Sequence, residues 1–206
     1  MAGRLFELDD FQLSVLREIG NIGAGHAATA LSVLMQKHIE MNVPRVHVVS
    51  IQEIDEVIGG AEQLVVGVYL RVEGEIPGSM FLMLKMESAN MLLQILTGSH
   101  QPVDSFSELE MSALMEVGNI LAGSYLSAFS DFTKTNLHAS VPAIAVDMAG
   151  ALINAVLLHI GMYSDRALVV DTEFRQGSEN VESHFFFVPD HGSVETIFKL
   201  LGVDFA

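Results

Sequence analysis

The chain has 206 residues, of which half are hydrophobic and none is cysteine, and its formal net charge is −16. This apolar content is enough for a full core, whereas the absence of cysteine excludes disulfides and thiolate sites. The acidic balance argues against nucleic acid or an anionic membrane as a direct partner, because both need a basic protein face. Because no signal peptide or spanning run of about 20 apolar residues is visible, we expect a cytoplasmic protein.

Two long amphipathic helices are predicted, one in each half of the chain. Asp9 and Gln12 are spaced as a capping pair for a helix that starts near residue 10 and runs to about Gln36. Ser107 and Glu110 form a stricter capping box for a helix over about 109–132. The two helix starts therefore correspond.

A proline follows each helix and is expected to begin a strand, because proline suits the first residue of a strand and stops a helix. In the first half, the pattern predicts strands over 45–51, 64–73 and 78–86, a helical turn at 52–59, and a helix over 88–97 capped by Gly98. In the second half, it predicts strands over 143–148, 154–163 and 183–189, and a helix over 192–201 followed by Gly202.

The segment 164–180 has no predicted counterpart in the first half, where the hairpin is tight, and its middle could form an extra strand. Helices segregated from runs of strands indicate an α+β fold. We predict one pseudo-twofold domain over 1–206, made of two repeats, about 9–98 and about 107–203. Each repeat has one long helix with an exposed motif, about three antiparallel strands and a C-terminal helix.

One motif occurs in both halves at a constant separation of 98 residues. Aligned without a gap, the windows 14–44 and 112–142 agree at twelve positions, which is the sign of an internal duplication. The shared pairs include Ser14/Ser112, Glu18/Glu116, Asn21/Asn119, Gly25/Gly123 and Pro44/Pro142. The molecule is therefore predicted to carry two copies of one site.

On an ideal helix, the shared Ser, Glu, Asn and Gly fall in an outward stripe about 60° wide. The inward residues are predicted to be Val15, Ile19, Ile22, Ala30 and Val33 in the first helix and Ala113, Val117, Ile120 and Ala128 in the second. An exposed Glu or Asn on one helix is usually only solvated surface. Because exposed positions drift easily after a duplication, identical residues in both copies indicate a function instead.

Other site chemistries have little support. The GNIGAG segment at 20–25 lacks the spacing of a phosphate loop and lies inside a helix. Gly20 and Gly23 are therefore expected to serve packing, and Gly25 and Gly123 to leave room for the backbone of a partner. The histidines show no metal-ligand spacing, His26 is expected near the inward face, and neither motif serine has a histidine base at helical reach. No metal site is predicted.

An outward Glu and Asn three residues apart suit the positioning of a water molecule. An amide holds water by donating and accepting hydrogen bonds. This suffices for hydrolysis of an activated phosphoryl bond, where catalysis is mostly geometry and electrostatics. The helix surface is expected to insert into the active site of another protein, with the Glu seeking a cation there.

The spacing S-x3-E-x2-N-x22-P, present twice, resembles the signature of the CheC/CheX/FliY family of chemotaxis phosphatases over nearly the whole chain. The resemblance implies hydrolysis of the aspartyl phosphate on the response regulator CheY, with Mg²⁺ supplied by that partner and no cofactor on this chain. It implies that both Asn residues orient the attacking water and that both Glu residues pair with the active-site lysine of the regulator. It assigns only partner contact to Ser14 and Ser112 and a structural role to Pro44 and Pro142.

The family also contains binders of the receptor deamidase CheD, and CheD is therefore an expected second partner of this chain. The chain is expected to be a monomer. The alternative is a non-catalytic binding module for phosphorylated CheY or CheD, as in flagellar switch proteins that share the fold. Intact Glu–Asn pairs in both halves favour the enzyme. It also stays possible that one site is active and the other has lost its activity, because the residues next to the motifs differ, as at Arg17 and Met115.

Overall fold

The computed structural model describes residues 8–98, 101–160, 166–177, 179–190 and 192–200. Its helices are α1 (Asp10–Met35), α2 (Ile54–Ile58), α3 (Met86–Thr97), α4 (Glu108–Thr133), α5 (Ala149–Ile160) and α6 (Ser193–Leu200), with a 3₁₀ turn, η1 (Ile51–Glu53), before α2. Its strands are β1 (Glu40–Ser50), β2 (Leu64–Gly74), β3 (Gly78–Lys85), β4 (Leu137–Ala139), β5 (Ala143–Met148), β6 (Arg166–Gln176) and β7 (Glu179–Pro189).

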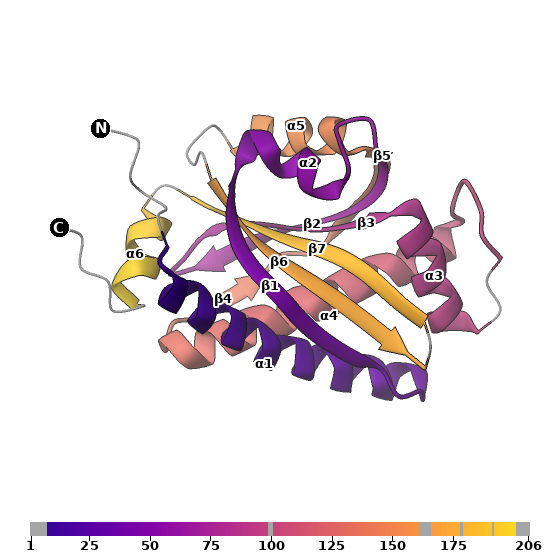
Figure 1. Ribbon diagram of the computed structural model, residues 1–206, viewed down its shortest axis with the longest axis horizontal. Helices are drawn as coiled ribbons and strands as arrows, with labels where there is room; N and C mark the ends of the chain where they lie inside the picture. Colours follow the sequence, from indigo (N-terminus) through magenta and orange to yellow (C-terminus); the bar gives the residue numbers. More distant parts are fainter. Residues whose placement is uncertain (1–7, 99–100, 161–165, 178, 191, 201–206) are drawn as a thin grey trace.

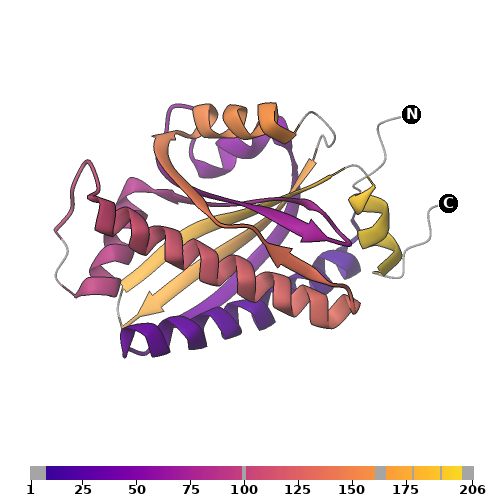
Figure 2. The same cartoon turned by 180° about the vertical axis from the view of Figure 1, so that it is seen from behind.

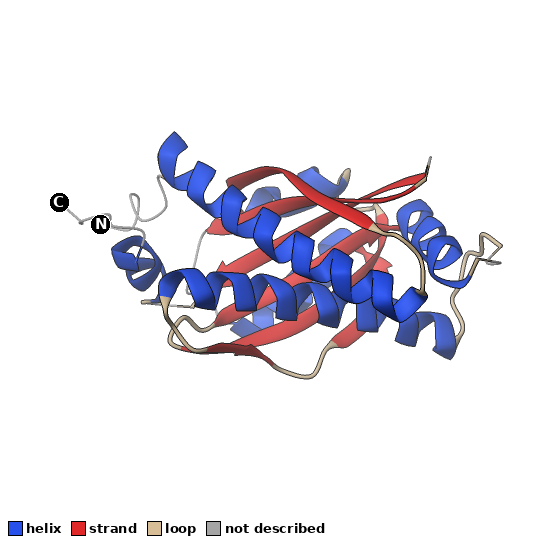
Figure 3. Ribbon diagram, turned by 90° about the horizontal axis from the view of Figure 1, so that it is seen from below, coloured by secondary structure: helices blue, strands red, loops and turns tan. Residues whose placement is uncertain are grey.

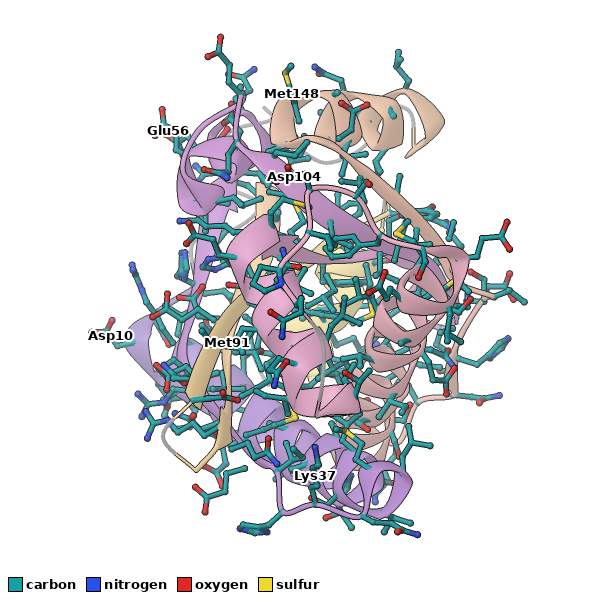
Figure 4. All side chains as sticks on the ribbon, turned by 90° about the vertical axis from the view of Figure 1, so that its right-hand side faces the viewer. Asp10, Lys37, Glu56, Met91, Asp104 and Met148 are labelled. Carbon is teal, nitrogen blue, oxygen red and sulfur yellow. The ribbon has the colours of Figure 1, made fainter. Side chains whose placement is uncertain are left out.

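A curled antiparallel sheet forms the middle layer of the molecule (Figure 1). The long helices α1 and α4 cover one face, and the short helices α2 and α5 cover the other. Viewed from the α3 end, Glu56 of α2 and Met148 beside α5 lie on one side of the sheet, and Lys37, just after α1, lies on the opposite side (Figure 4). Each face has its own apolar core.

The two halves exchange strands within this sheet. The strand order is β1-β6-β7-β3-β2-β4, and β5 also pairs with β2. The first strand of each half therefore pairs with the second strand of the other half, and β3 and β7 pair at the centre. The predicted α+β fold with an internal duplication is confirmed.

The long helices begin where their capping residues predict. Asp9 Oδ1 accepts the N–H of Gln12 at 2.8 Å, and Gln12 Oε1 accepts the N–H of Asp9 at 2.8 Å. Ser107 and Glu110 exchange the same two hydrogen bonds at the start of α4. Helix α3 ends at Gly98, whose φ of +74° provides the predicted left-handed cap.

Two predictions for the second half are wrong. Residues 154–160, which we expected in a strand, belong to helix α5, because a continuous apolar run fits a buried strand and a buried helix equally well. The segment 164–180 is not an insertion: its described part forms β6 and the start of β7. The β6–β7 hairpin is the counterpart of β2–β3, and α5 is the counterpart of α2. Gly202 lies outside the described residues.

The prediction for the first proline is also wrong. Pro44 lies inside β1 rather than at its first residue, at a register shift between Asn42 and Arg45 in the pairing with β6. An irregularity of this kind tolerates a residue that has no N–H. Pro142 directly precedes β5, as expected.

The buried face of α1 is rotated by about a quarter turn from the predicted one. Its buried residues are Gln12, Leu16, Ile19, Gly20, Gly23, Ala24, Ala27 and Leu31. Of the predicted inward residues, only Ile19 is buried, Val15 is half-buried, and Ile22, Ala30 and Val33 are exposed, as is His26. Small residues make up half of this packed face. In α4, Val117 and Ala128 are buried and Ala113 and Ile120 half-buried, and the buried face is again about a quarter turn from the predicted one.

Glycines allow α1 and α4 to approach each other and the sheet. A Cβ atom on Gly23 would lie 2.5 Å from Tyr125 Cδ1 and 3.0 Å from Tyr125 Cα. Gly20 packs against Val43 and Gly118 against Val68. The predicted packing role of Gly20 and Gly23 is confirmed. Across the described residues, no helix is both long and apolar enough to cross a membrane.

Candidate functional site

The two copies of the motif lie on the outer surface of the α1–α4 layer. Helices α1 and α4 lie side by side and run in opposite directions (Figures 2 and 3). In α1, Ser14, Glu18 and Gly25 are exposed and Asn21 is half-buried. Ser112, Glu116, Gly123 and Asn119 repeat this pattern in α4. The prediction that the shared residues face away from the core is confirmed.

The backbone of β1 positions the first motif asparagine. The buried N–H of Val43 donates a hydrogen bond to Asn21 Oδ1 at 2.9 Å. The register shift at Pro44 takes Val43 out of the pairing with β6, so its N–H is free to turn toward α1. Our sequence reasoning missed Val43, although an identical valine precedes the proline in both halves.

The second motif asparagine has a different environment. Asn119 and Gly123 line a surface hollow beside β4, with Ser127, Asp131 and His138 among the other lining residues. In the described structure, no hydrogen bond joins Asn119 to Val141, the exposed counterpart of Val43. The two copies are therefore similar in exposure, but among the described residues only Asn21 is held by a hydrogen bond from the segment before the motif proline.

The segment that carries Val141 is fastened to the sheet rather than to α4. The N–H of Arg71 donates to Ser140 Oγ at 2.9 Å, and the N–H of Ser140 donates to the Arg71 carbonyl at 2.8 Å. In the first half, the corresponding segment is part of the continuous strand β1. Because of this difference, Pro44 lies inside a strand and Pro142 lies just before one, although the two prolines occupy equivalent positions in the sequence.

Both motif carboxylates are available to a partner. Within the ranges that the structure describes, the side chains of Glu18 and Glu116 have no hydrogen-bond or ion-pair partner. A free carboxylate on a helix surface is suited to accept a cation that another protein brings. Because no cation of the described residues occupies either Glu, docking would not require an ion pair within that part of the chain to break.

The remaining stripe residues do not form a nucleophile. Ser14 Oγ donates to the Phe11 carbonyl at 2.6 Å, and Ser112 Oγ donates to the Glu108 carbonyl at 2.8 Å. These bonds use each hydroxyl proton within the helix. A Cβ atom added to Gly25 or Gly123 would meet nothing within 4 Å, so packing within this chain does not require glycine at either position.

A separate polar cluster lies on the opposite sheet face. His184 Nδ1 is 2.8 Å from Asp171 Oδ1, and His47 Nδ1 is 3.7 Å from Asp171 Oδ2. Burial lowers the pKa of His47; Arg45 and His184 act in the same direction, and Asp171 opposes them. The described residues contain no group of three or more His, Asp or Glu side chains placed to bind a metal ion.

A cavity under α1 and α4 offers no reacting groups. Its lining is apolar and includes Leu16, Tyr125, Phe129 and Phe185. Tyr125, the one titratable residue in the lining, donates to or accepts from Thr172 Oγ1 at 2.7 Å, and burial raises its pKa. This cavity therefore adds no candidate to the residues of the outer stripes.

Comparison with known proteins agrees with the duplicated motif. The model of a family described as CheC-like matches residues 11–48 and 109–146. The chain is 40% identical to the CheY-P phosphatase CheC of Bacillus subtilis over 93% of this chain and 94% of that protein. It is 24% identical to the putative CheY-P phosphatase CheC1 of Halobacterium salinarum over 89% of this chain and 92% of that protein.

Solved structures share the fold. The structure of FliY from Thermotoga maritima superposes with a TM-score of 0.75 at 19% identity, over 96% of this chain and 98% of that one. The middle domain of FliM from H. pylori gives 0.65 at 14% identity, over 94% and 99%.

Proposed function

This chain belongs to the CheC-like family, and on that basis we propose that it is a phosphatase acting on the aspartyl phosphate of a CheY-type response regulator. The observation that carries the proposal is the 40% identity to a CheY-P phosphatase over 93% of the chain. The exposed Glu and the half-buried Asn beside it in both halves agree with it, because they give a partner's phosphoryl group access to both motifs.

We propose that Asn21 and Asn119 orient the attacking water. The water oxygen attacks phosphorus, the bond to the aspartyl oxygen of the regulator breaks with its electron pair, and inorganic phosphate leaves. An Asn amide has two acceptor lone pairs and two N–H donors. In Asn21, Val43 uses one lone pair, and the groups left over are enough to accept from and donate to one water.

Glu18 and Glu116 serve docking in this proposal. Each would pair with the active-site lysine that the family resemblance implies for the regulator. The Mg²⁺ that the resemblance implies in the regulator would neutralise charge on the phosphoryl oxygens. Positioning and electrostatics of this kind suffice for phosphoryl transfer, so the chain need not form a covalent intermediate.

The test is the rate at which a phosphorylated CheY-type regulator loses phosphate. Wild type should accelerate the loss, and Asn21→Ala with Asn119→Ala should abolish the acceleration while regulator binding persists. Each single variant shows whether its own site works. Glu18→Ala with Glu116→Ala should raise the regulator concentration needed for half-maximal rate.

Two results would contradict the proposal. If wild type binds the phosphorylated regulator and leaves its phosphate lifetime unchanged, the chain is a non-catalytic binding module. If the double Asn variant keeps full activity, Asn does not position the water.

The family resemblance also supports the proposal that the chain binds the deamidase CheD, which co-elution of the two proteins in gel filtration would test.

A further inference from the structure

Large apolar side chains lie exposed beside both motif stripes. In α1, Phe11 is 71% exposed and Ile22 is 45% exposed. Their counterparts 98 residues later in α4 are Leu109, which is 80% exposed, and Ile120, which is half-buried. At about 100° per residue, the four lie about 20° to 40° from the motif Glu of their helix. They therefore share a face with Glu, and the motif Asn lies about 80° to 100° from them, on the other side of Glu.

The packing of this chain accounts for Ile120, which lies half-buried against the core, but not for the exposed Phe11, Ile22 and Leu109. The buried faces of α1 and α4 lie on the opposite side, toward Leu16 and Leu114. An exposed position costs little to make polar, and single exposed apolar residues are common. Here, however, apolar residues recur in both halves at the same places relative to the motif. Farther along the helix, Val33 corresponds to Asp131, and the exposed apolar pair Leu34 and Phe132 lies on another face, about 160° from the motif Glu.

We propose that Phe11 and Ile22 in the first site, and Leu109 and Ile120 in the second, are apolar flanks that pack against the response regulator around its phosphorylation site. This inference rests on the proposed function. The flanks would contact the regulator whenever Asn21 or Asn119 reaches its phosphoryl group.

The size of a typical protein interface supports the response regulator as the partner that covers these side chains. A standard interface covers about 800 Å² on each partner, a patch with a radius of about 16 Å. Phe11 precedes Asn21 by ten residues, about 15 Å along the helix axis, and Ile22 follows it directly. A domain that places its phosphoryl group at Asn21 therefore covers both side chains.

The energetics also require an apolar contribution. An ion pair between exposed charges, such as one formed by Glu18, contributes little affinity. Most binding energy comes from a few large side chains that lose contact with water in the interface. Phe11 and Leu109 are large and are already held on rigid helices, so little conformational freedom is lost when they are covered.

The experiment compares two pairs of equivalent surface substitutions. The flank variant is Phe11→Ser with Leu109→Ser. The control is Leu34→Ser with Phe132→Ser, which are 61% and 51% exposed, also 98 residues apart, and about 160° from the motif Glu. Dephosphorylation is measured against regulator concentration, and binding to the regulator activated by beryllium trifluoride and Mg²⁺ is measured separately.

The flank variant should raise KM and the Kd about tenfold and leave kcat within about twofold of wild type. The control should match wild type, and Phe11→Leu with Leu109→Met should restore most of the affinity. Equal Kd values for the flank variant and wild type would overturn the inference, as would a wild type that does not bind the activated regulator. If wild type binds without hydrolysis, the proposed function fails, and the Kd of the flank variant still decides the inference.

Discussion

At the scale of single residues, the hydrogen bond from the N–H of Val43 gives Asn21 a structural role in addition to its proposed catalytic role. Val43 is buried, and its N–H makes no hydrogen bond in the described β1–β6 pairing. Asn21 Oδ1 therefore accepts a hydrogen bond from a buried donor that would otherwise have no acceptor. Asn119 has no such duty toward Val141, which is exposed.

We therefore expect unequal stability effects from equivalent substitutions. Asn21→Ala should lower the free energy of unfolding by about 1–3 kcal/mol, because a buried N–H loses its acceptor. Asn119→Ala should change it by about 0.5 kcal/mol or less, as is usual for surface substitutions. Urea denaturation of both variants followed by circular dichroism makes the comparison. Equal losses in the two variants would show that the Val43 contact contributes nothing.

His47 should make the stability of the chain sensitive to acid. Burial, aided by Arg45 and His184 and opposed by Asp171, lowers its pKa from the ordinary value of 6.5, so the folded state binds this proton less readily than the unfolded state. Its contribution is fully present above about pH 6.5 and is lost as the pH falls through the lowered pKa. His47→Gln should therefore lose less stability than wild type between pH 7.5 and pH 5.5.

The urea midpoint at each pH measures this difference. His38→Gln is the matched control, because the His38 side chain is largely exposed beside Glu40. If His47→Gln and wild type lose the same stability on acidification, then His47 is not the group that titrates.

At the scale of helices and strands, two glycines of α1 should respond oppositely to alanine. Gly23→Ala would place a methyl group against the ring and backbone of Tyr125. Overpacking of this kind costs about 1–3 kcal/mol, more than the gain of about 1 kcal/mol in helix propensity. Gly25→Ala meets open space and should stabilise the chain by up to about 1 kcal/mol.

The activity of Gly25→Ala tests the predicted role of the stripe. If a partner's backbone approaches this position, the variant should be more stable and yet dephosphorylate the regulator more slowly. Greater stability with wild-type kinetics would remove Gly25 from the contact surface. A Gly23→Ala variant as stable as wild type would mean that α1 and α4 can separate without cost.

The exposed stripes could be predicted because duplication retained residues that packing does not require. The buried face of α1 could not, because Gly20, Gly23, Ala24 and Ala27 make up half of it, and small residues add little to a hydrophobicity pattern. Helix α5 was missed because its apolar run has no clear period. The exchange of strands was missed because long-range pairing leaves no local signal in the chain.

At the scale of the whole molecule, the exchange of strands makes each half depend on the other. Within the first half, β2 and β3 form a hairpin, but β1 pairs with β6 and β2 also pairs with β5 of the second half. The helix pair that covers this sheet likewise takes α1 from one half and α4 from the other. Neither half contains a complete sheet or a complete helical layer.

We therefore expect residues 1–100 and 101–206, produced separately, to lack the native structure. Each would expose the apolar face of an unpaired strand and of a long helix, and a two-stranded hairpin alone is at best marginally stable. Mixing the two polypeptides should restore the native circular dichroism and the dephosphorylation of the regulator, because every strand then regains its partner. Dispersed ¹H–¹⁵N spectra of each half, before and after mixing, are the measurement. A half that alone unfolds cooperatively in urea with the native spectrum would show that the repeats fold independently and that the exchanged pairing is not needed for stability.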